Sequence, residues 1–168
     1  MVNLRDNKRL WDRVKHTDPR FTKKVNKGAY SFTAIDAHYN VLKATAEWGP
    51  WGVGWGWDDK DGWPQLIEGV LHVSARLWYM EEIGMDDSGA IITAKRICSP
   101  VEGTAKLTGT NRNGPYVDDE AMKKARTDFL SKSFSYLGFS ADVYLGFFDN
   151  HKYVESMRSR FNKEKENE

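Results

Sequence analysis

The spacing of apolar and polar positions divides the first third of the chain into helical and extended segments. Apolar side chains recur at helical spacing among charged ones in residues 3–16, which predicts an N-terminal helix. Pro19 and Gly28 mark the segment "HTDPRFTKKVNKGAY" as a loop, and the run "YSFTAI" predicts a short strand. Asp36 is placed to cap a helix over "AHYNVLKATAEW", which Gly49 and Pro50 end.

A period of two begins in the segment "WGPWGVGWGW", residues 48–57. In "VGWGW" the side chains of Val53, Trp55 and Trp57 alternate with glycine, which predicts a strand with one bare face. A bare face lets another element approach the backbone closely. The rings are either a platform on which nucleic-acid bases stack or the joint of a folded core.

Two further strands follow. Residues 66–80 alternate well, with one apolar face, and the opposite face carries Glu68, His72, Ser74 and Arg76. The acidic segment "EEIGMDDSG" predicts a turn, and "AIITAKRIC" predicts a third strand. Three successive strands joined by turns indicate an antiparallel meander.

The C-terminal half reads as a polar segment followed by helices. The segment "SPVEGTAKLTGTNRNGPYV" has no apolar period and predicts a long loop. Asp118 or Asp119 caps a predicted helix over "EAMKKARTDFLSKSFSYLG", whose broad apolar arc lies opposite small hydroxyls and lysines. Two short helices, "SADVYLGFFD" and "NHKYVESMRSRF", close the chain. We therefore predict an α+β fold with a curved antiparallel meander of three long strands plus one short strand, crossed by a long helix, with N-terminal and C-terminal helices.

Length and composition add the domain count. A chain of 168 residues with 40% hydrophobic content predicts one domain, residues 1–162, and the polar residues 163–168 predict a disordered tail. The single cysteine, Cys98, allows no internal disulfide. No signal peptide or membrane span is recognisable, so we expect a cytoplasmic protein, in the host cytoplasm if a phage encodes it.

Charge is balanced overall but unevenly distributed. Lys and Arg number 25 against 24 Asp and Glu, yet residues 1–30 hold nine basic and three acidic residues. A basic segment on an otherwise acidic body favours an anionic ligand such as a phosphate backbone, although a solvated surface gives the same pattern.

Candidate catalytic groups are few. The chain contains no phosphate-binding loop motif, no CxxC and no HExxH, so we expect no cofactor. Two acidic clusters, 58–61 and 118–120, have the residue types that hold Mg²⁺ in nucleases, but turns and helix starts account for them equally. A metal-dependent nuclease therefore stays open as an alternative function.

Two segments resemble the single-strand annealing proteins of the Rad-fifty-two superfamily, especially the short phage proteins of the Sak type. "FTAIDAHYNVLKATAEWGPWGVGWGW" is similar to the family's strand, helix and aromatic-glycine strand. "MKKARTDFLSKSFSYLGFSADVYLGFFDNHKYV" is similar to its long helix and the short helices that follow. The resemblance covers about residues 17–155 and preserves the order of the elements.

The resemblance implies a homo-oligomeric ring or arc, joined through sheet edges, that binds single-stranded DNA in a basic groove. It implies annealing of complementary strands in recombination and DNA repair without nucleotide hydrolysis, hence no enzyme, with a single-strand-binding protein as a further candidate partner. Lys132 matches a basic family position on the long helix, while Ser131 and Ser135 stand where the family is basic. Combining the resemblance with strand phase, the expected DNA-binding residues are Arg20, Lys23, Lys24, Lys27, Arg76, Lys95, Arg96, Lys124 and Lys132.

The same resemblance bears on the tryptophans. It places Trp51, Trp55 and Trp57 where helix and sheet join, so we expect them to be mainly core, with base stacking left open for one exposed ring. A non-catalytic RNA-binding or interaction module remains a third possible function.

Overall fold

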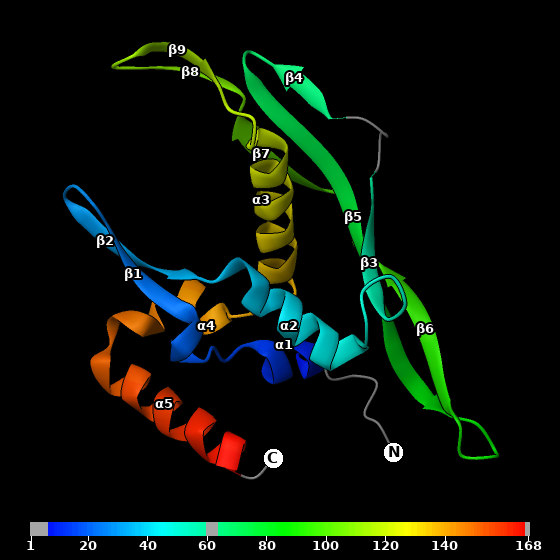
Figure 1. Cartoon of the computed structure of the whole chain (residues 1–168). Coiled ribbons are helices and arrows are strands. Elements are labelled where there is room, and N and C mark those ends of the chain that lie inside the picture. The colour runs from blue at the N-terminus through cyan, green and yellow to red at the C-terminus, as the bar shows by residue number, and fades with distance from the viewer. Residues whose placement is uncertain (1–6, 60–63, 167–168) are drawn as a thin grey trace. The chain divides into compact units, whose positions relative to one another are not determined.

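The computed structural model describes residues 7–59 and 64–166 and confirms the predicted α+β class (Figure 1). The chain forms two compact units, one of residues 44–133 and the other of residues 7–43 together with 134–166. In sequence, the first unit is inserted between the two halves of the second. No helix in the described residues is long and apolar enough to cross a membrane.

The first unit is organised around one long strand, β5 (Val70–Met85). Four shorter strands pair antiparallel with successive parts of it: β3 (Trp55–Asp59), β4 (Gln65–Ile67), β6 (Ile91–Ile97) and β7 (Val101–Lys106). The predicted meander is present as β3, β5 and β6. Leu71, Val73 and Leu77 are buried on one face of β5, as the alternation predicts.

The single strand predicted over residues 66–80 is in fact a hairpin of β4 and β5. The chain reverses at Glu68 and Gly69, which both have positive φ angles, 49° and 76°. The two-residue turn shifts the alternation, because Leu66 pairs with Leu71 and Ile67 pairs with Val70, so Leu66 and not Ile67 lies on the face of Leu71. Both residues before the turn are apolar, so the pattern of apolar positions does not reveal the reversal. Glutamate is also an unusual residue for the left-handed region.

The long loop predicted after Cys98 is wrong as well, because most of it is extended. It contains β7 and a separate hairpin of β8 (Thr108–Asn111) and β9 (Gly114–Val117). Nearly all side chains of that hairpin are exposed, so neither strand carries the apolar alternation that identifies a half-buried strand.

The helix α3 (Ala121–Tyr136) covers the apolar face of the sheet in the first unit. Ala121 and Ala125 pack against Leu71 and Val73. Gly103 on β7 makes this approach possible, because a Cβ there would lie 2.1 Å from the carbonyl oxygen of Ala125. The expected crossing of the sheet by a long helix thus depends on a position without a side chain.

The tryptophan-glycine segment forms the start of this sheet. Trp55 is buried, Trp48 stacks on Tyr79 at 4.5 Å, and a Cβ at Gly54 would lie 1.6 Å from the carbonyl oxygen of Trp48. The observed strand begins two residues after the predicted one. Val53 lies in a turn and is exposed, so it does not share a face with Trp55.

The second unit is built from both ends of the described chain. Its elements are α1 (Arg9–Val14), a 3-10 turn (Pro19–Phe21), β1 (Thr22–Lys27), β2 (Tyr30–Ile35), the start of α2 (Ala37–Trp48), α4 (Ala141–Tyr144), a second 3-10 turn (Phe147–Asp149) and α5 (His151–Glu166). The basic segment predicted as a loop is the strand β1, paired with β2. The predicted N-terminal helix is shorter, and residues 3–6 lie outside the described residues. Residues 163–166, expected in a disordered tail, are the last turn of α5.

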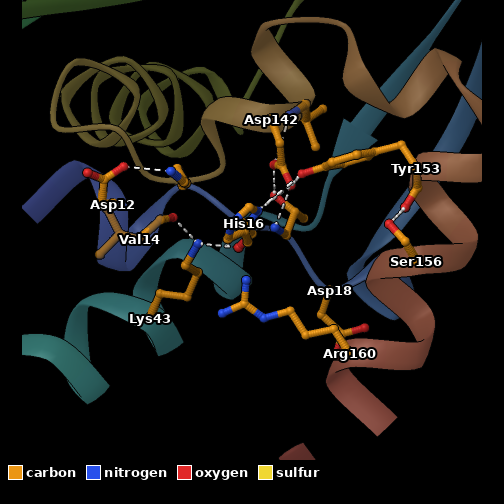
Figure 2. A network of polar contacts seen from close by, with 12 residues as sticks. Asp12, Val14, His16, Asp18, Lys43, Asp142, Tyr153, Ser156 and Arg160 are labelled. Carbon is orange, nitrogen blue, oxygen red and sulfur yellow. Dashed lines mark hydrogen bonds and ion pairs between the residues drawn. The ribbon is translucent and has the colours of Figure 1, made fainter. Parts of the chain in front are cut away.

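A buried polar network joins these segments (Figure 2). The carboxylate of Asp142 accepts hydrogen bonds from the backbone N–H of Thr17 at 2.8 Å, its hydroxyl at 2.6 Å and the Tyr153 hydroxyl at 2.9 Å. The ammonium group of Lys43 donates to the carbonyls of Val14 and His16. Burial lowers the pKa of Lys43 to about 8. Because its polar groups are paired, this network fixes the positions of α1, α2, α4 and α5 in the unit.

Candidate nucleic-acid interface

Five of the nine predicted DNA-binding cations are held in ion pairs. Each lies 2.6–2.9 Å from a carboxylate, in the pairs Arg20–Asp18, Lys24–Asp149, Arg96–Glu81, Lys124–Asp118 and Lys132–Asp128. Apart from the pair with Asp18, which is buried, such pairs are worth only about 0–1 kcal/mol, so a phosphate can replace the carboxylate. Such a cation nevertheless contributes less to binding than one whose charge is unpaired.

Arg20 has a structural role beyond its charge. Its partner Asp18 is buried and also accepts a hydrogen bond from the Arg20 backbone N–H at 2.9 Å. The contact with Asp18 raises the pKa of Arg20. Arg20 therefore compensates a buried carboxylate next to the first 3-10 turn.

The predicted cations of the first unit lie on different strands, on different faces of the sheet and on α3. Lys95 and Arg96 are neighbours on β6 and so point to opposite faces. The Lys95 ammonium lies 4.2 Å from the centre of the Trp78 ring, and Arg76 sits directly across from Asp58. On α3, Lys132 also donates to the Glu102 carbonyl at 3.1 Å. These residues form no continuous row of unpaired positive charge in the first unit.

The hairpin of β1 and β2 does concentrate unpaired charge on one face. Its register pairs Lys23 with Ala34, Val25 with Phe32 and Lys27 with Tyr30, and paired residues share a face. Lys23 and Lys27 have no ion-pair partner in the described part of the chain. Lys24 lies on the opposite face, consistent with its separate pairing to Asp149. The hairpin thus places two lysines and two aromatic rings together.

The two rings on this face are open to solvent. Tyr30 is 62% exposed and Phe32 39% exposed, and their ring centres lie 6.2 Å apart in a stacked arrangement. The Lys27 ammonium lies 6.0 Å from the centre of the Phe32 ring. Adjacent exposed rings flanked by lysines can accept stacked bases and neighbouring phosphates. We call Lys23, Val25, Lys27, Tyr30 and Phe32 the hairpin face.

Sequence reasoning missed the aromatic half of this face. The signal was present, since "KKVNKGAYSF" places Lys23, Val25 and Lys27 at alternate positions before Gly28, and Tyr30 and Phe32 at alternate positions after it. Treating the first run as a loop concealed that the two runs pair.

The tryptophans of residues 48–57 differ in burial, so some belong to the core and one could stack on a base. Trp55 is core, and Trp57 is partly buried with its ring 6.3 Å from Phe129. Trp51 is 60% exposed, its ring 5.4 Å from that of Trp57. Trp51 is therefore the ring of this segment on which a base could stack.

The acidic clusters do not assemble a metal site among the residues that the structure describes. No group of three or more metal-ligating side chains lies together there. Asp118 binds Lys124 and accepts a hydrogen bond from the Glu120 backbone N–H at 3.1 Å. Asp61 of the other cluster lies outside the described residues.

Neither the protein-family models nor the curated protein sequences compared with this chain contain a match to it.

Proposed function

We propose that the protein binds single-stranded DNA through the hairpin face and anneals complementary strands without hydrolysing a nucleotide. The observation that carries the proposal is the arrangement of Lys23, Lys27, Tyr30 and Phe32 on one face of β1 and β2. Stacking on aromatic side chains tolerates any base, and lysines track the phosphates, so this arrangement suits a strand without sequence preference. The motif resemblance to annealing proteins supports the same function.

The lysines and the rings have separable signatures. Replacing Lys23 and Lys27 by alanine removes up to two phosphate contacts, which lowers affinity and flattens the salt dependence by about 1.4 units of log–log slope on a single strand. Replacing Tyr30 and Phe32 by alanine lowers affinity by about 1–3 kcal/mol per stacked base while the slope is unchanged. Both are measured by fluorescence anisotropy with a labelled oligonucleotide at several salt concentrations.

A matched control removes the same charge elsewhere. Lys152 and Lys165 lie on α5, and their double alanine variant loses two positive charges with the hairpin face intact. If the affinity falls equally in this control, the loss in the hairpin variant is caused by net charge and not by the hairpin face. Normal binding by both hairpin variants would refute the proposed interface.

Annealing is tested with complementary labelled oligonucleotides. We expect equal rates with and without ATP, and no cleavage in the presence of Mg²⁺. Strict dependence on ATP would contradict the proposal, and Mg²⁺-dependent cleavage would favour the nuclease. RNA that competes more strongly than single-stranded DNA would favour an RNA-binding module.

Self-association through sheet edges forms part of the proposal. Within the described residues, β4 and β6 pair only with β5, so no other strand pairs with their outer edges. The outer edge of β7 is bonded to α3, through Asp128 at Thr104 and Lys132 at Glu102. On β6, Ile91 and Ile97 are exposed. Long exposed apolar edges are normally paired or covered, and pairing between copies would give a ring or arc. A strictly monomeric mass at micromolar concentration, with and without DNA, would refute it. Such an assembly would act in recombination in the cytoplasm.

A further inference from the structure

The hairpin of β8 and β9 projects from the first unit and pairs with no other strand of the described residues (Figure 1). Thr108–Asn111 pair only with Gly114–Val117, and Arg112 and Asn113 join the two strands. We call residues 108–117 the ribbon. Every ribbon residue that has a side chain is exposed, and the two that are not exposed are glycines. The ribbon therefore adds nothing to the core of the unit, and its side chains can contact a partner.

The ribbon is fastened at its base and stiffened by one ring. The Leu107 backbone N–H donates to the Gly69 carbonyl at 2.8 Å, and the Asp118 backbone N–H donates to the Leu107 carbonyl at 2.7 Å. On the ribbon, Tyr116 lies directly opposite Gly109, where a Cβ would lie 2.7 Å from the tyrosine oxygen. The ring thus lies across the bare glycine, and an aromatic residue opposite a strand glycine stabilises the pairing. The ribbon is therefore a shaped projection that a partner can recognise.

The ribbon lies in the positively charged part of an acidic unit. The described residues of the first unit comprise 13 acidic and 9 basic residues, yet residues 103–117 hold Lys106 and Arg112 and no acidic residue. Both side chains are exposed, and neither has an ion-pair partner in the described part of the chain. After the ribbon, Asp118 and Glu120 are bound to lysines of α3. This distribution of charge favours an anionic partner at the ribbon.

The uncharged side chains of the ribbon suit hydrogen bonding to a nucleic acid. The hydroxyls of Thr108, Thr110 and Tyr116 have no hydrogen-bond partner among the described residues, and Asn111 and Asn113 add amides. Hydroxyl, amide and arginine side chains are the groups that bind phosphate oxygens and base edges. The ribbon has one aromatic ring, whereas stacking the bases of a single strand takes several rings in succession. These features favour a duplex over a single strand.

We propose that the ribbon binds duplex DNA in the major groove, which is wide enough to admit two paired strands. Lys106 and Arg112 lie at opposite ends of an extended segment, at most about 20 Å apart. They can therefore reach phosphates on the two sides of a groove that is about 12 Å wide, while Thr110 and Asn111 between them face its floor. The proposal does not require that the hairpin face binds a single strand. If both functions hold, the ribbon binds the duplex that annealing produces.

The probes are labelled duplex DNA, duplex RNA of the same sequence and single-stranded DNA. Each is titrated with the full chain by fluorescence anisotropy at several salt concentrations. We expect duplex DNA to bind more tightly than duplex RNA, because the major groove of an A-form helix is too deep and narrow for side chains to read. Equal affinity for the two duplexes, or no binding of duplex DNA, would overturn the proposal.

Two variants at exposed ribbon positions test the contact. Arg112→Ala should weaken duplex DNA and reduce the log–log salt slope by about 0.9, the value for one phosphate contact on B-form DNA. Thr110→Glu places a negative charge in the middle of the ribbon and should also weaken duplex binding. Arg126→Ala is the control, because it removes the same charge from an exposed position on α3 and should change duplex binding less. Unchanged duplex affinity in both ribbon variants, or an equal loss in the control, would overturn the proposal.

Crossing variants with probes separates the ribbon from the hairpin face. Arg112→Ala should weaken duplex DNA more than single-stranded DNA, and Tyr30→Ala should leave duplex binding unchanged. If Arg112→Ala weakens both probes equally, the ribbon belongs to a single-strand path and the proposal fails. Failure of the hairpin face would instead appear as a Tyr30→Ala variant that binds single-stranded DNA normally.

A protein partner for the ribbon is the competing explanation. A second copy of the chain could pair with the free edges of β8 or β9, and Thr110→Glu would then lower the oligomeric mass in the absence of DNA. We expect the mass measured by light scattering to be the same for Thr110→Glu and the wild type. A lower mass in Thr110→Glu, with normal duplex binding, would replace the duplex by a second copy and overturn the proposal.

Discussion

The Lys24 ammonium lies 2.9 Å from the carboxylate of Asp149, 125 residues further along the chain. A carboxylate offers a lysine the same kind of charged acceptor that a phosphate does. Both side chains are largely exposed, so the pair contributes little to stability and water screens it. In the proposed function, Asp149 would therefore compete with a DNA phosphate for Lys24, which lies on the opposite side of the β1–β2 hairpin from the hairpin face.

Asp149→Asn should strengthen binding of single-stranded DNA. The substitution frees the Lys24 charge and removes a negative charge from the same surface, and the gain should shrink as salt rises. Anisotropy titrations at two salt concentrations measure it. Asp87→Asn, in the exposed turn between β5 and β6, removes the same charge at another place and should change binding less. Equal effects of the two variants would show that Lys24 is not a contact.

Trp55→Ala should lower the free energy of unfolding by about 3–5 kcal/mol, as truncation of a buried aromatic side chain does. Trp55 is among the largest fully buried side chains, and its indole N–H lies 3.4 Å from the Thr45 hydroxyl. Urea unfolding measures the loss. Trp51→Ala removes an exposed ring and should change stability little. If Trp55→Ala is as stable as the wild type and binds DNA poorly, the tryptophans are a stacking platform.

Gly103→Ala should destabilise the first unit by about 1–3 kcal/mol or more, since the new methyl group meets backbone atoms that cannot rotate away. It would lie 2.1 Å from the Ala125 carbonyl oxygen and 2.5 Å from the Phe129 nitrogen. Gly84→Ala is the control, because no other heavy atom lies within 4 Å of a Cβ there. Thermal unfolding compares the two variants, and equal stability would disprove the close helix–sheet contact.

Lys43 predicts a rise of stability with pH. The folded chain gives up the Lys43 proton near pH 8, because burial lowers a pKa that is ordinarily 10.5. The unfolded chain keeps the proton in that interval and binds more protons, so the free energy of unfolding rises with pH, by about 2 kcal/mol at most between pH 8 and 10.

The window ends near pH 10 because tyrosine then ionises in the unfolded chain. Burial raises the pKa of Tyr39 to about 12, so the folded chain keeps this proton after the unfolded chain has lost it. The free energy of unfolding therefore falls as the pH rises above 10. Lys43→Met should flatten the rise between pH 8 and 10, whereas Lys152→Met, at an exposed position, should keep it. An unchanged rise in Lys43→Met would show that another group causes it.

Local signals predicted local structure well. The strand "YSFTAI" and the helix "AHYNVLKATAEW" match β2 and α2 at both ends. Asp36 accepts a hydrogen bond from the His38 backbone N–H at 2.9 Å, and Gly49 follows the helix with a φ of +93°. These boundaries are set by residues that are adjacent to the element ends in the sequence, so the sequence alone is sufficient to place them.

Relationships between distant segments were not readable. The pairing of Lys24 with Asp149 joins positions with no local signal, and it decides which predicted cations carry an unpaired charge. The buried network likewise joins Thr17 to Asp142, which lies 125 residues later in the chain. The alternation of residues 70–80 was correct, but the reversal before it could not be read, because Leu66 and Ile67 are both apolar and hide the change of phase that the turn introduces.

The insertion of one unit within the other has a consequence for the order of folding during synthesis. A ribosome completes residues 44–133 before it makes residues 134–166, so every strand that pairs with β5 is available first. Residues 7–43 are made earlier but cannot complete the second unit, because Thr17 has its hydrogen-bond partner Asp142 only after that residue is synthesised. The hairpin of β1 and β2 pairs locally and can form early, but the hydrogen bonds that join the α1 segment to α4 are completed last. Slow translation beyond Ser133 would prolong a species with a folded sheet and an open second unit.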